Sequence, residues 1–165
     1  MKRSRRVEIF EQIRAEYAGF LASVLWKLTG DKELFAEAMQ YAMLGMWRHV
    51  EKLDGKKAGA YIYRIALTAN STAWRNRIGK DGQISPGRPG SEKGPSEKVS
   101  DSELVALVRR AIAQLPTRQS RAIVMRYVEQ QSYEVVAEKL CCSEAGARSN
   151  VSKALAALKR KLRNE

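Results

Sequence analysis

The sequence predicts an all-α protein made of two small helical domains joined by a flexible linker, and three observations support this. Apolar residues recur three and four positions apart in both halves of the 165-residue chain, whereas the β-branched alternation typical of strands is absent. Hydrophobic residues make up 44% of the chain, which is enough for a core in each half. One stretch between the halves concentrates glycine and proline.

That stretch, GKDGQISPGRPGSEKGPSEKVSD, covers residues 79–101 and holds five of the 11 glycines and three of the four prolines. Glycine and proline interrupt helices, and almost no apolar residue is present to bury. We therefore expect a first domain over 1–78, a flexible linker over 79–101 and a second domain over 102–165.

The charge of the chain favours a polyanionic partner. Lys and Arg number 30 against 18 Asp and Glu, which gives a net charge of +12. The linker is balanced, with four residues of each sign, so the excess lies in the halves: 14 basic against 8 acidic residues before it, and 12 against 6 after it. Each half carries +6, and this symmetry predicts two basic surfaces that contact one long polyanion.

The N-terminal MKRSRR is followed by the charged, amphipathic VEIFEQIRAEY. No apolar run there is long enough for a signal peptide or a membrane span, so we expect a cytoplasmic protein without membrane insertion.

The chain offers little for catalysis. Two adjacent cysteines, Cys141 and Cys142, and the single histidine, His49, do not supply the four ligands of a zinc site. Neither a nucleophile–base pair nor a phosphate-binding glycine loop is evident. We expect no metal, no cofactor and no enzymatic activity.

A helix is predicted over 33–50, with an apolar arc that faces the core: Phe35, Met39, Ala42, Met43, Met46 and Val50. The opposite arc mixes an acid, an amide, an aromatic ring, a leucine and an arginine: Glu37, Gln40, Tyr41, Leu44 and Arg48. Such a mixture suits a protein partner, although an ordinary surface with scattered apolar residues stays open.

The next predicted helix, 59–78, has an inward face of Tyr61, Ile62, Ile65, Ala66, Ala69 and Ala73. Its other side combines aromatic, amide and basic residues: Tyr63, Asn70, Trp74 and Arg77, flanked by Arg64, Ser71 and Arg75. Rings between basic side chains suit single-stranded nucleic acid, since bases stack on the rings and the cations follow the backbone. The alternative is that Trp74 packs under the linker and the arginines are merely solvated.

In the second half, one helical stripe consists of Leu104, Leu107, Val108, Ile112 and Leu115. Pro116 ends that helix and Thr117 is available to cap the next, which runs to about Val128. Ser132 and Ser143 are expected to cap the last two helices.

The last helix has an inward stripe of Ala147, Val151, Ala154, Leu155, Leu158 and Leu162. Its outward residues are Arg148, Ser149, Ser152, Lys153 and Arg160. Small polar residues between long basic ones let a helix enter the DNA major groove, although such a face can also be simply solvated.

Three stretches resemble one family, the extracytoplasmic-function group of bacterial sigma factors. KELFAEAMQYAMLGMWRHV resembles its second region, AYIYRIALTANSTAWRNR resembles its promoter-reading helix, and LVRRAIAQLPTRQSRAIVMRYVEQQSYEVVAEKLCCSEAGARSNVSKALAALKRKL resembles its fourth region. The resemblance covers about 15–162. It implies a region 2 helical bundle and a region 4 helix-turn-helix on one non-catalytic chain that takes part in transcription initiation.

The resemblance also implies partners and contact residues. Glu37 and Gln40 match an acid and a glutamine on the helix that grips the coiled coil of the largest polymerase subunit, which makes Glu37, Gln40, Tyr41, Leu44 and Arg48 the expected polymerase-binding set. The 59–78 helix and its DNA-facing residues correspond to recognition and melting of the minus-ten element, and the loop 51–58 to capture of a flipped base. The family commonly has asparagine and aspartate where Thr68 and Thr72 stand.

In the same way Arg148, Ser149, Ser152 and Lys153 fall on positions that contact the minus-thirty-five element, and this region of the family also docks on the flap of the second largest subunit. Cys141 stands where the family favours the glycine of the turn, and a non-glycine residue in a left-handed conformation costs about 1 kcal/mol. Cys142 is expected to pack inward as a structural thiol, with a redox role as the alternative.

The sequence thus predicts a sigma factor that binds core RNA polymerase and promoter DNA, in a family that usually has an anti-sigma partner. A stand-alone helix-turn-helix regulator, with an N-terminal oligomerisation or sensing domain, is the alternative. As a free coil the linker spans about 26 Å, less than the roughly 34 Å of one DNA turn. Two promoter elements more than one turn apart can therefore be contacted together only if the linker is stretched. The free protein is expected to be compact or variable, and the bound one extended.

Overall fold

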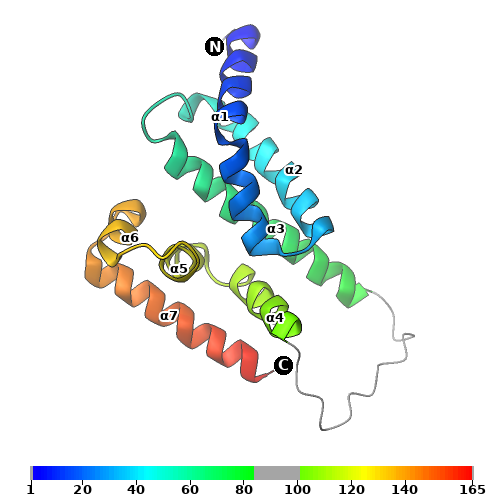
Figure 1. Ribbon diagram of the computed structural model, residues 1–165, viewed down its shortest axis with the longest axis vertical. Coiled ribbons are helices and arrows are strands. Elements are labelled where there is room, and N and C mark those ends of the chain that lie inside the picture. The colour runs from blue at the N-terminus through cyan, green and yellow to red at the C-terminus, as the bar shows by residue number, and fades with distance from the viewer. Residues whose placement is uncertain (1, 84–100, 165) are drawn as a thin grey trace.

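The computed structural model describes residues 2–83 and 101–164, and within these ranges it contains helices and no strand (Figure 1). The elements in order are α1 (Arg3–Thr29), α2 (Lys32–Arg48), the 3-10 turn η1 (Val50–Lys52), α3 (Ala58–Gln83), α4 (Asp101–Ala113), α5 (Thr117–Ile123), the π-helical turn η2 (Val124–Val128), α6 (Tyr133–Leu140) and α7 (Glu144–Arg163). We call α1–α3 the first module and α4–α7 the second. The all-α prediction is confirmed.

The first module is a three-helix bundle in which α2 packs mainly on α3. Gly30 ends α1 in the left-handed region, with φ of 59°, and Asp31 then caps α2 by accepting a hydrogen bond from the Leu34 amide at 2.9 Å. The residues that α2 buries are Leu34, Ala38, Ala42 and Met46. The expected inward residues Phe35, Met39 and Met43 are only half-buried, so the inward face of α2 is centred one position nearer the N-terminus than predicted.

Helix α3 continues to Gln83, beyond Gly79, where the linker was expected to begin. Glycine weakens a helix by about 1 kcal/mol but keeps its N–H, and the first proline comes only at Pro86. The rest of the expected linker, 84–100, lies outside the described residues, and Asp101 already belongs to α4.

The second module contains the predicted helix-turn-helix. Ser132 accepts from the Val135 amide at 3.3 Å and Ser143 from the Gly146 amide at 3.0 Å, so both predicted caps are confirmed. Thr117 is not a cap, because Pro116 occupies the N-cap position of α5. The buried stripe of α7 is Ala147, Val151, Ala154 and Leu158, whereas Leu155, expected to point inward, is exposed.

The turn between α6 and α7 is made by the two cysteines. Cys141 has φ of 52° and ψ of 51°, the left-handed conformation in which the family favours glycine, and its amide donates to Ala137 and Glu138. Cys142 is half-buried and packs against the core. Cys141 therefore takes the left-handed conformation that was expected for the turn, although it carries a Cβ, and Cys142 packs inward only in part.

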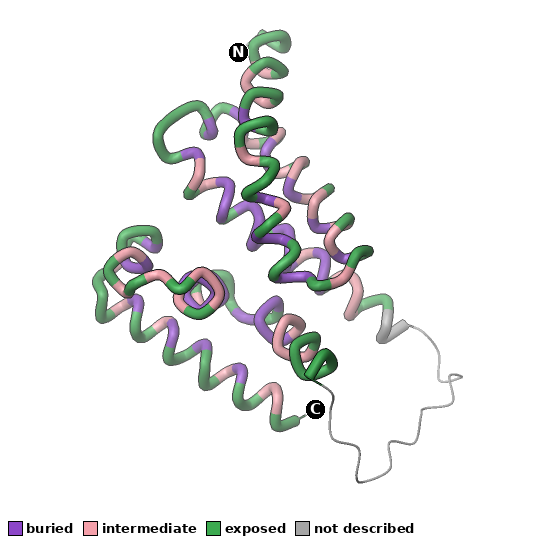
Figure 2. The backbone as a smooth tube through the Cα atoms, in the orientation of Figure 1, coloured by how far each residue is buried: buried purple, intermediate pink, exposed green. Residues whose placement is uncertain are grey.

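The two modules pack against each other, with α4 and α5 against α3 (Figure 1). Arg109 of α4 donates from Nε to the Lys27 carbonyl at 2.9 Å, and Lys27 Nζ lies 3.7 Å from Glu129 Oε1. Buried residues line the facing sides of the helices in both modules and merge into one apolar cluster (Figure 2). None of the helices described is long and apolar enough to cross a membrane.

Candidate nucleic-acid interface

Most of the α3 face predicted to stack with nucleic acid is buried. Tyr63, Ser71 and Trp74 expose 7 to 8% of their surface, and Asn70 only 2%. Helix α3 has α1 and α2 on one side and α4 and α5 on the other, so only a narrow stripe of it stays in solvent. The prediction that these four side chains are exposed is therefore wrong for this structure, in which the two modules pack against each other.

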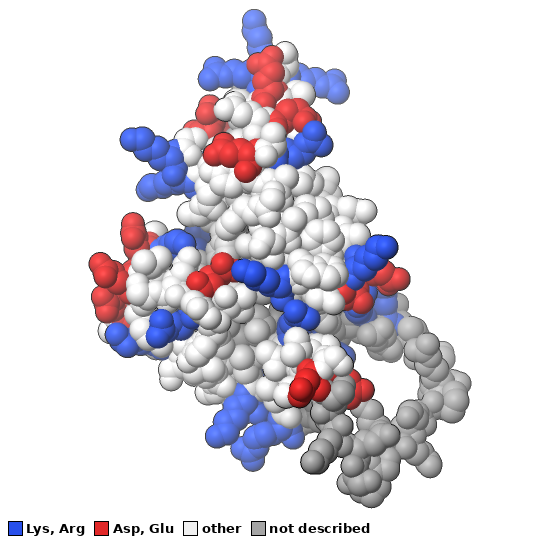
Figure 3. Space-filling view, in the orientation of Figure 1, with Lys and Arg blue, Asp and Glu red and all other residues white. Residues whose placement is uncertain are grey.

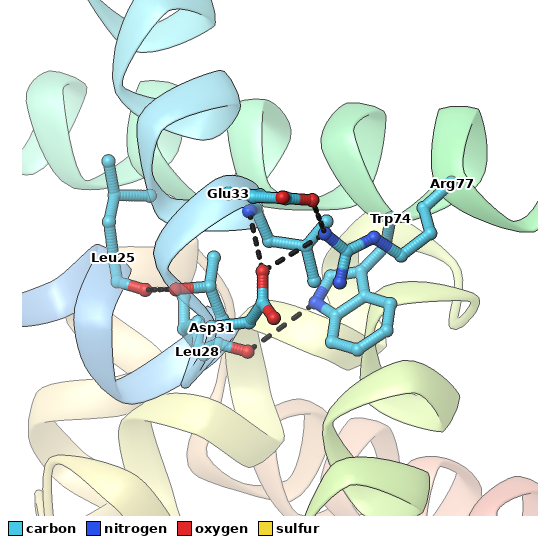
Figure 4. Close-up of polar contacts among 8 residues, drawn as sticks. Leu25, Leu28, Asp31, Glu33, Trp74 and Arg77 are labelled. Atoms are coloured by element: carbon cyan, nitrogen blue, oxygen red, sulfur yellow. Dashed lines mark hydrogen bonds and ion pairs between the residues drawn. The ribbon is translucent and has the colours of Figure 1, made fainter.

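Trp74 and Arg77 contact the junction between α1 and α2 (Figure 4). The Trp74 indole N–H donates to the Leu28 carbonyl at 3.5 Å, and Arg77 pairs with Asp31 at 3.0 Å and with Glu33 at 3.5 Å. The hydrogen bond from Arg77, followed by that from the Leu34 amide, lowers the pKa of Asp31. These contacts fix the start of α2. They pack Trp74 against the α1–α2 junction, whereas the alternative to stacking had been that it packs under the linker.

Tyr63 lies at the junction of the modules. Its ring is 6.1 Å from that of Phe20 in α1. Burial, and then the negative charge of Glu129, raise the pKa of Tyr63, so its hydroxyl stays neutral.

The exposed stripe of α3 is centred on Arg64, Thr68 and Arg75, with Thr72 partly exposed. Spacings of four and three place these residues along one line of the helix. The Thr68 and Thr72 hydroxyls donate to the carbonyls of Arg64 and Thr68, at 3.0 and 2.9 Å. Arg64 and Arg75 thus remain solvent-facing as predicted. The polar side chains between them on this stripe are Thr68 and Thr72 rather than the predicted Asn70 and Ser71.

A groove of about 380 Å³ runs between α2 and α3. Its lining includes Tyr41, Leu44, Arg48, Tyr61, Arg64 and Thr68. The Tyr61 ring lies 5.7 Å from that of His49, and it carries the cations of Arg64 at 5.7 Å and Lys52 at 5.9 Å. The groove therefore combines aromatic rings, cations and hydroxyls, the chemistry that single-stranded nucleic acid requires.

Sequence reasoning assigned Tyr61 to the inward face and so missed this groove. The available signal was the four-residue spacing of Arg64, Thr68 and Thr72, which marks the solvent side of the helix more reliably than the aromatic residues do.

The five residues predicted to bind polymerase lie along α2, but they differ in exposure. Gln40, Leu44 and Arg48 are exposed, and Leu44 shows 50% of its surface. Glu37 and Tyr41 are half-buried because the Asn76 amide of α3 donates to both, at 3.1 Å to Glu37 Oε1 and 2.7 Å to Tyr41 Oη. The exposed end of the arc is thus available to a partner, whereas Glu37 and Tyr41 also join α2 to α3.

On α7, the predicted DNA-facing residues Arg148, Ser149, Ser152 and Lys153 are all exposed. The Arg148 guanidinium lies 4.2 Å over the Tyr133 ring and 3.8 Å from Glu144, two contacts that orient it at the start of α7. Lys153 adjoins a shallow depression that Lys159, Arg160 and Arg163 also line. In Figure 3, basic side chains gather near the C-terminal end of α7. The exposed face of α7 in the helix-turn-helix is therefore polar, with its basic residues most concentrated toward the C-terminal end.

Two family models match the chain in the order of its two modules. Residues 13–77 match Sigma-70 region 2, and residues 106–158 match Sigma-70, region 4. No curated protein matches the chain. The first match covers most of α1 to α3 and the second runs from α4 into α7, and this pair is the signature of sigma factors of the extracytoplasmic-function type. The chain therefore belongs to the sigma-70 family, whose members are transcription initiation factors that recognise promoters.

Proposed function

We propose that the protein binds core RNA polymerase as an extracytoplasmic-function sigma factor, directs it to promoters and helps to separate the DNA strands. The observation that carries this proposal is the ordered pair of family matches, each on a module with an exposed basic or aromatic-basic surface. Each module alone is too small to select a promoter. Core polymerase therefore holds both modules against the DNA at the same time.

For polymerase, the proposed contact is the exposed end of the α2 arc, with Gln40, Leu44 and Arg48 against the coiled coil of the largest subunit. An exposed leucine between an amide and an arginine gives a small apolar centre with polar surroundings, which is the composition of many protein interfaces. Glu37 and Tyr41 contribute here as well, at the cost of their contacts with Asn76. The second module is proposed to contact the flap of the second largest subunit.

For the minus-ten element, the groove between α2 and α3 supports a stacking and cation site built on Tyr61, Arg64 and Thr68, with Arg75 further along α3. Tyr63 and Trp74 line clefts that residues of both modules form. They become available to DNA only when the modules separate. Asn70, Ser71 and Arg77 are further minus-ten contacts on the resemblance alone. For the minus-thirty-five element, Arg148, Ser149, Ser152 and Lys153 are the proposed contacts on the strip along α7.

The direct test is run-off transcription with purified core polymerase on a library of promoters. Transcripts that start at defined promoters only when the protein is added support the proposal. Core polymerase that gives the same transcripts without the protein would contradict it.

A gel shift separates this proposal from the stand-alone regulator. A regulator binds duplex DNA tightly by itself, whereas a sigma factor of this group is expected to bind promoter DNA well only after polymerase joins it. Equal, high affinity with and without core enzyme would favour the regulator.

A further inference from the structure

The first turns of α1 carry a group of cations that the family match does not cover. The match to Sigma-70 region 2 begins at residue 13, and four of the five residues 2–6 are basic: Lys2, Arg3, Arg5 and Arg6. The first turn of α1 holds no acidic residue. In Figure 1, this end of α1 projects beyond the rest of the first module. The proposed function uses none of these side chains.

This end of α1 packs against the end of α2. The Arg6 guanidinium donates to the Trp47 carbonyl at 2.9 Å and lies 5.0 Å from the centre of the Trp47 ring. The Phe10 ring meets the same indole edge-on, with ring centres 5.4 Å apart. These contacts fix the direction of the first turns of α1, although Lys2 provides no side-chain cap.

The acidic residues of this segment lie on a different side of the helix from the Trp47 contact. A spacing of three places Arg3 beside Arg6, one turn nearer the N-terminus. Glu8 and Glu11 each follow one of these arginines by five residues, and five residues turn an α-helix by about 140°. Glu11 is also paired with Arg14. In the part of the chain that the structure describes, no ion pair neutralises Arg3 or Arg6.

The end of α2 connects these arginines to the groove between α2 and α3. Trp47 holds Arg6, and the next residue, Arg48, lines the groove. Lys52 of η1 lies 5.9 Å from the centre of the Tyr61 ring in the same groove, and η1 also packs against α1. Cations therefore continue from the groove, the proposed site of the separated strand, to the start of α1.

Arg3 and Arg6 suit phosphates better than bases. Trp47 is half-buried, and Arg6 and Phe10 already contact its ring, so it is a poor platform for stacking. A guanidinium group binds phosphate through its charge and its paired N–H donors. Cations at the start of a helix also oppose its dipole, so their position weakens α1. A polyanion beside them would offset this cost.

We propose that Arg3 and Arg6 bind phosphates of promoter DNA at the edge of the segment whose strands separate. The DNA-contacting surface of the first module then continues past the groove onto α1. This inference rests on the proposed function, because DNA held in the groove is what brings phosphates beside α1. The contact is electrostatic and reads no bases, so it is the same on every promoter.

The salt dependence of DNA binding tests this contact. The complex of the full chain with core polymerase is titrated with fluorescent promoter DNA from about 50 to 200 mM KCl, and each phosphate contact contributes about 0.9 to the slope of log affinity against log salt. Arg3→Ala should lower that slope by about 0.9 and weaken binding about fivefold near 0.1 M salt, equally on promoters with and without the upstream element. Arg3→Lys keeps the charge and should bind as the wild type does.

Arg5→Ala is the matched control. Arg5 is exposed like Arg3, but it lies about 160° away from it around the helix, so its loss should leave the slope unchanged. Equal slopes for the wild type and Arg3→Ala, or an equal fall with Arg5→Ala, would overturn the contact. Weaker binding of Arg3→Ala to core polymerase without DNA would also overturn it, in favour of an acidic protein surface.

The same titration separates this contact from the function on which it rests. If the complex fails to bind promoter DNA at all, both the proposed function and the contact are wrong. If the complex binds promoter DNA and starts transcripts, but with the same salt slope in the wild type and Arg3→Ala, only the contact is wrong.

Discussion

Asp31 stabilises the first module in two ways, because it caps α2 and pairs with Arg77 of α3 (Figure 4). The ion pair and the cap lower its pKa in the folded state below the ordinary value of 3.8. A lowered folded pKa means that this carboxylate contributes stability above about pH 4, and that the contribution is lost as the pH falls through the lowered value. The Asp31 side chain is 45% exposed, so solvent screens the pair.

Asp31→Asn is therefore expected to lower the free energy of unfolding at pH 7 by about 0.5 to 1 kcal/mol and to flatten its decline between pH 5 and pH 3. Urea unfolding across that pH range measures both. In an Arg77→Met background the substitution should cost less, because the ion pair is already absent and asparagine caps a helix about as well as aspartate. An unchanged pH profile would show that Asp31 is not the group that titrates.

Trp74 and Arg64 lie on the same helix, yet their replacement should have different consequences. Trp74 is buried, so Trp74→Ala is expected to destabilise the protein by about 3 kcal/mol. Arg64 is exposed in the groove, so Arg64→Ala should leave stability nearly unchanged and lower strand separation about tenfold. Urea unfolding and permanganate footprinting of promoter complexes separate the two effects. If the Trp74→Ala protein is fully stable but fails to separate the promoter strands, Trp74 stacks with DNA bases as first predicted.

At the scale of elements, α7 presents the exposed face that is proposed to contact DNA. Arg148→Ala together with Lys153→Ala is expected to weaken use of the upstream promoter element by a few kcal/mol in total, while polymerase binding stays intact. Competition transcription between promoters with and without that element measures the change. Arg3→Ala together with Arg5→Ala, at two exposed arginines near the N-terminal end of α1, is the charge-matched control. Equal promoter preference in wild type and variant would remove both residues from the DNA-facing surface.

Helix α2 is expected to carry the polymerase contact at its exposed positions. Glu37→Ala with Gln40→Ala should lower affinity for core polymerase, which co-purification measures. Asn76→Ala is the control for Glu37, because it removes the hydrogen bonds from Asn76 to Glu37 and Tyr41 and leaves the Glu37 and Gln40 side chains in place. If Asn76→Ala weakens polymerase binding as much as the double substitution does, the loss reflects the bundle rather than the interface.

Over the whole molecule, docking of the modules rests on few polar contacts. Arg109→Ala removes the hydrogen bond to the Lys27 carbonyl, and it should increase the mean radius of gyration of the free protein in small-angle scattering. Transcription at saturating polymerase should be unchanged, because the bound form is expected to be extended and to lack this contact. Arg163→Ala, at the end of α7, is the control. Identical scattering from wild type and Arg109→Ala would show that this contact does not determine docking.

The parts of the fold that depend on local sequence could be predicted. Ser132 and Ser143 cap helices through amides only three residues away, and the apolar repeat Ala147, Val151 and Ala154 identifies the single buried side of α7. The surface of α3 could not be predicted in this way, since helical periodicity cannot tell which sides of a helix other elements cover. Tyr63 is buried through partners far along the chain, which the second module supplies.

The groove needed the same long-range information. Tyr41 and Tyr61 come together only because α2 and α3 pack side by side, and no spacing within either helix records their juxtaposition. Exposure of Arg148 and Lys153 was predictable because α7 has one covered side and lies at the edge of the molecule.

The polar side chains of Tyr63, Arg121 and Glu129 lie where the two modules meet, and this has a consequence for how reversibly the modules close. Each buried group left without a partner costs about 1 to 3 kcal/mol relative to its hydrated state, so opening returns that energy and offsets part of the lost apolar contact. A perfectly complementary interface would trap the chain in its closed form. On the proposed function, this imperfect fit keeps the closed form weak enough for core polymerase to separate the modules when it binds.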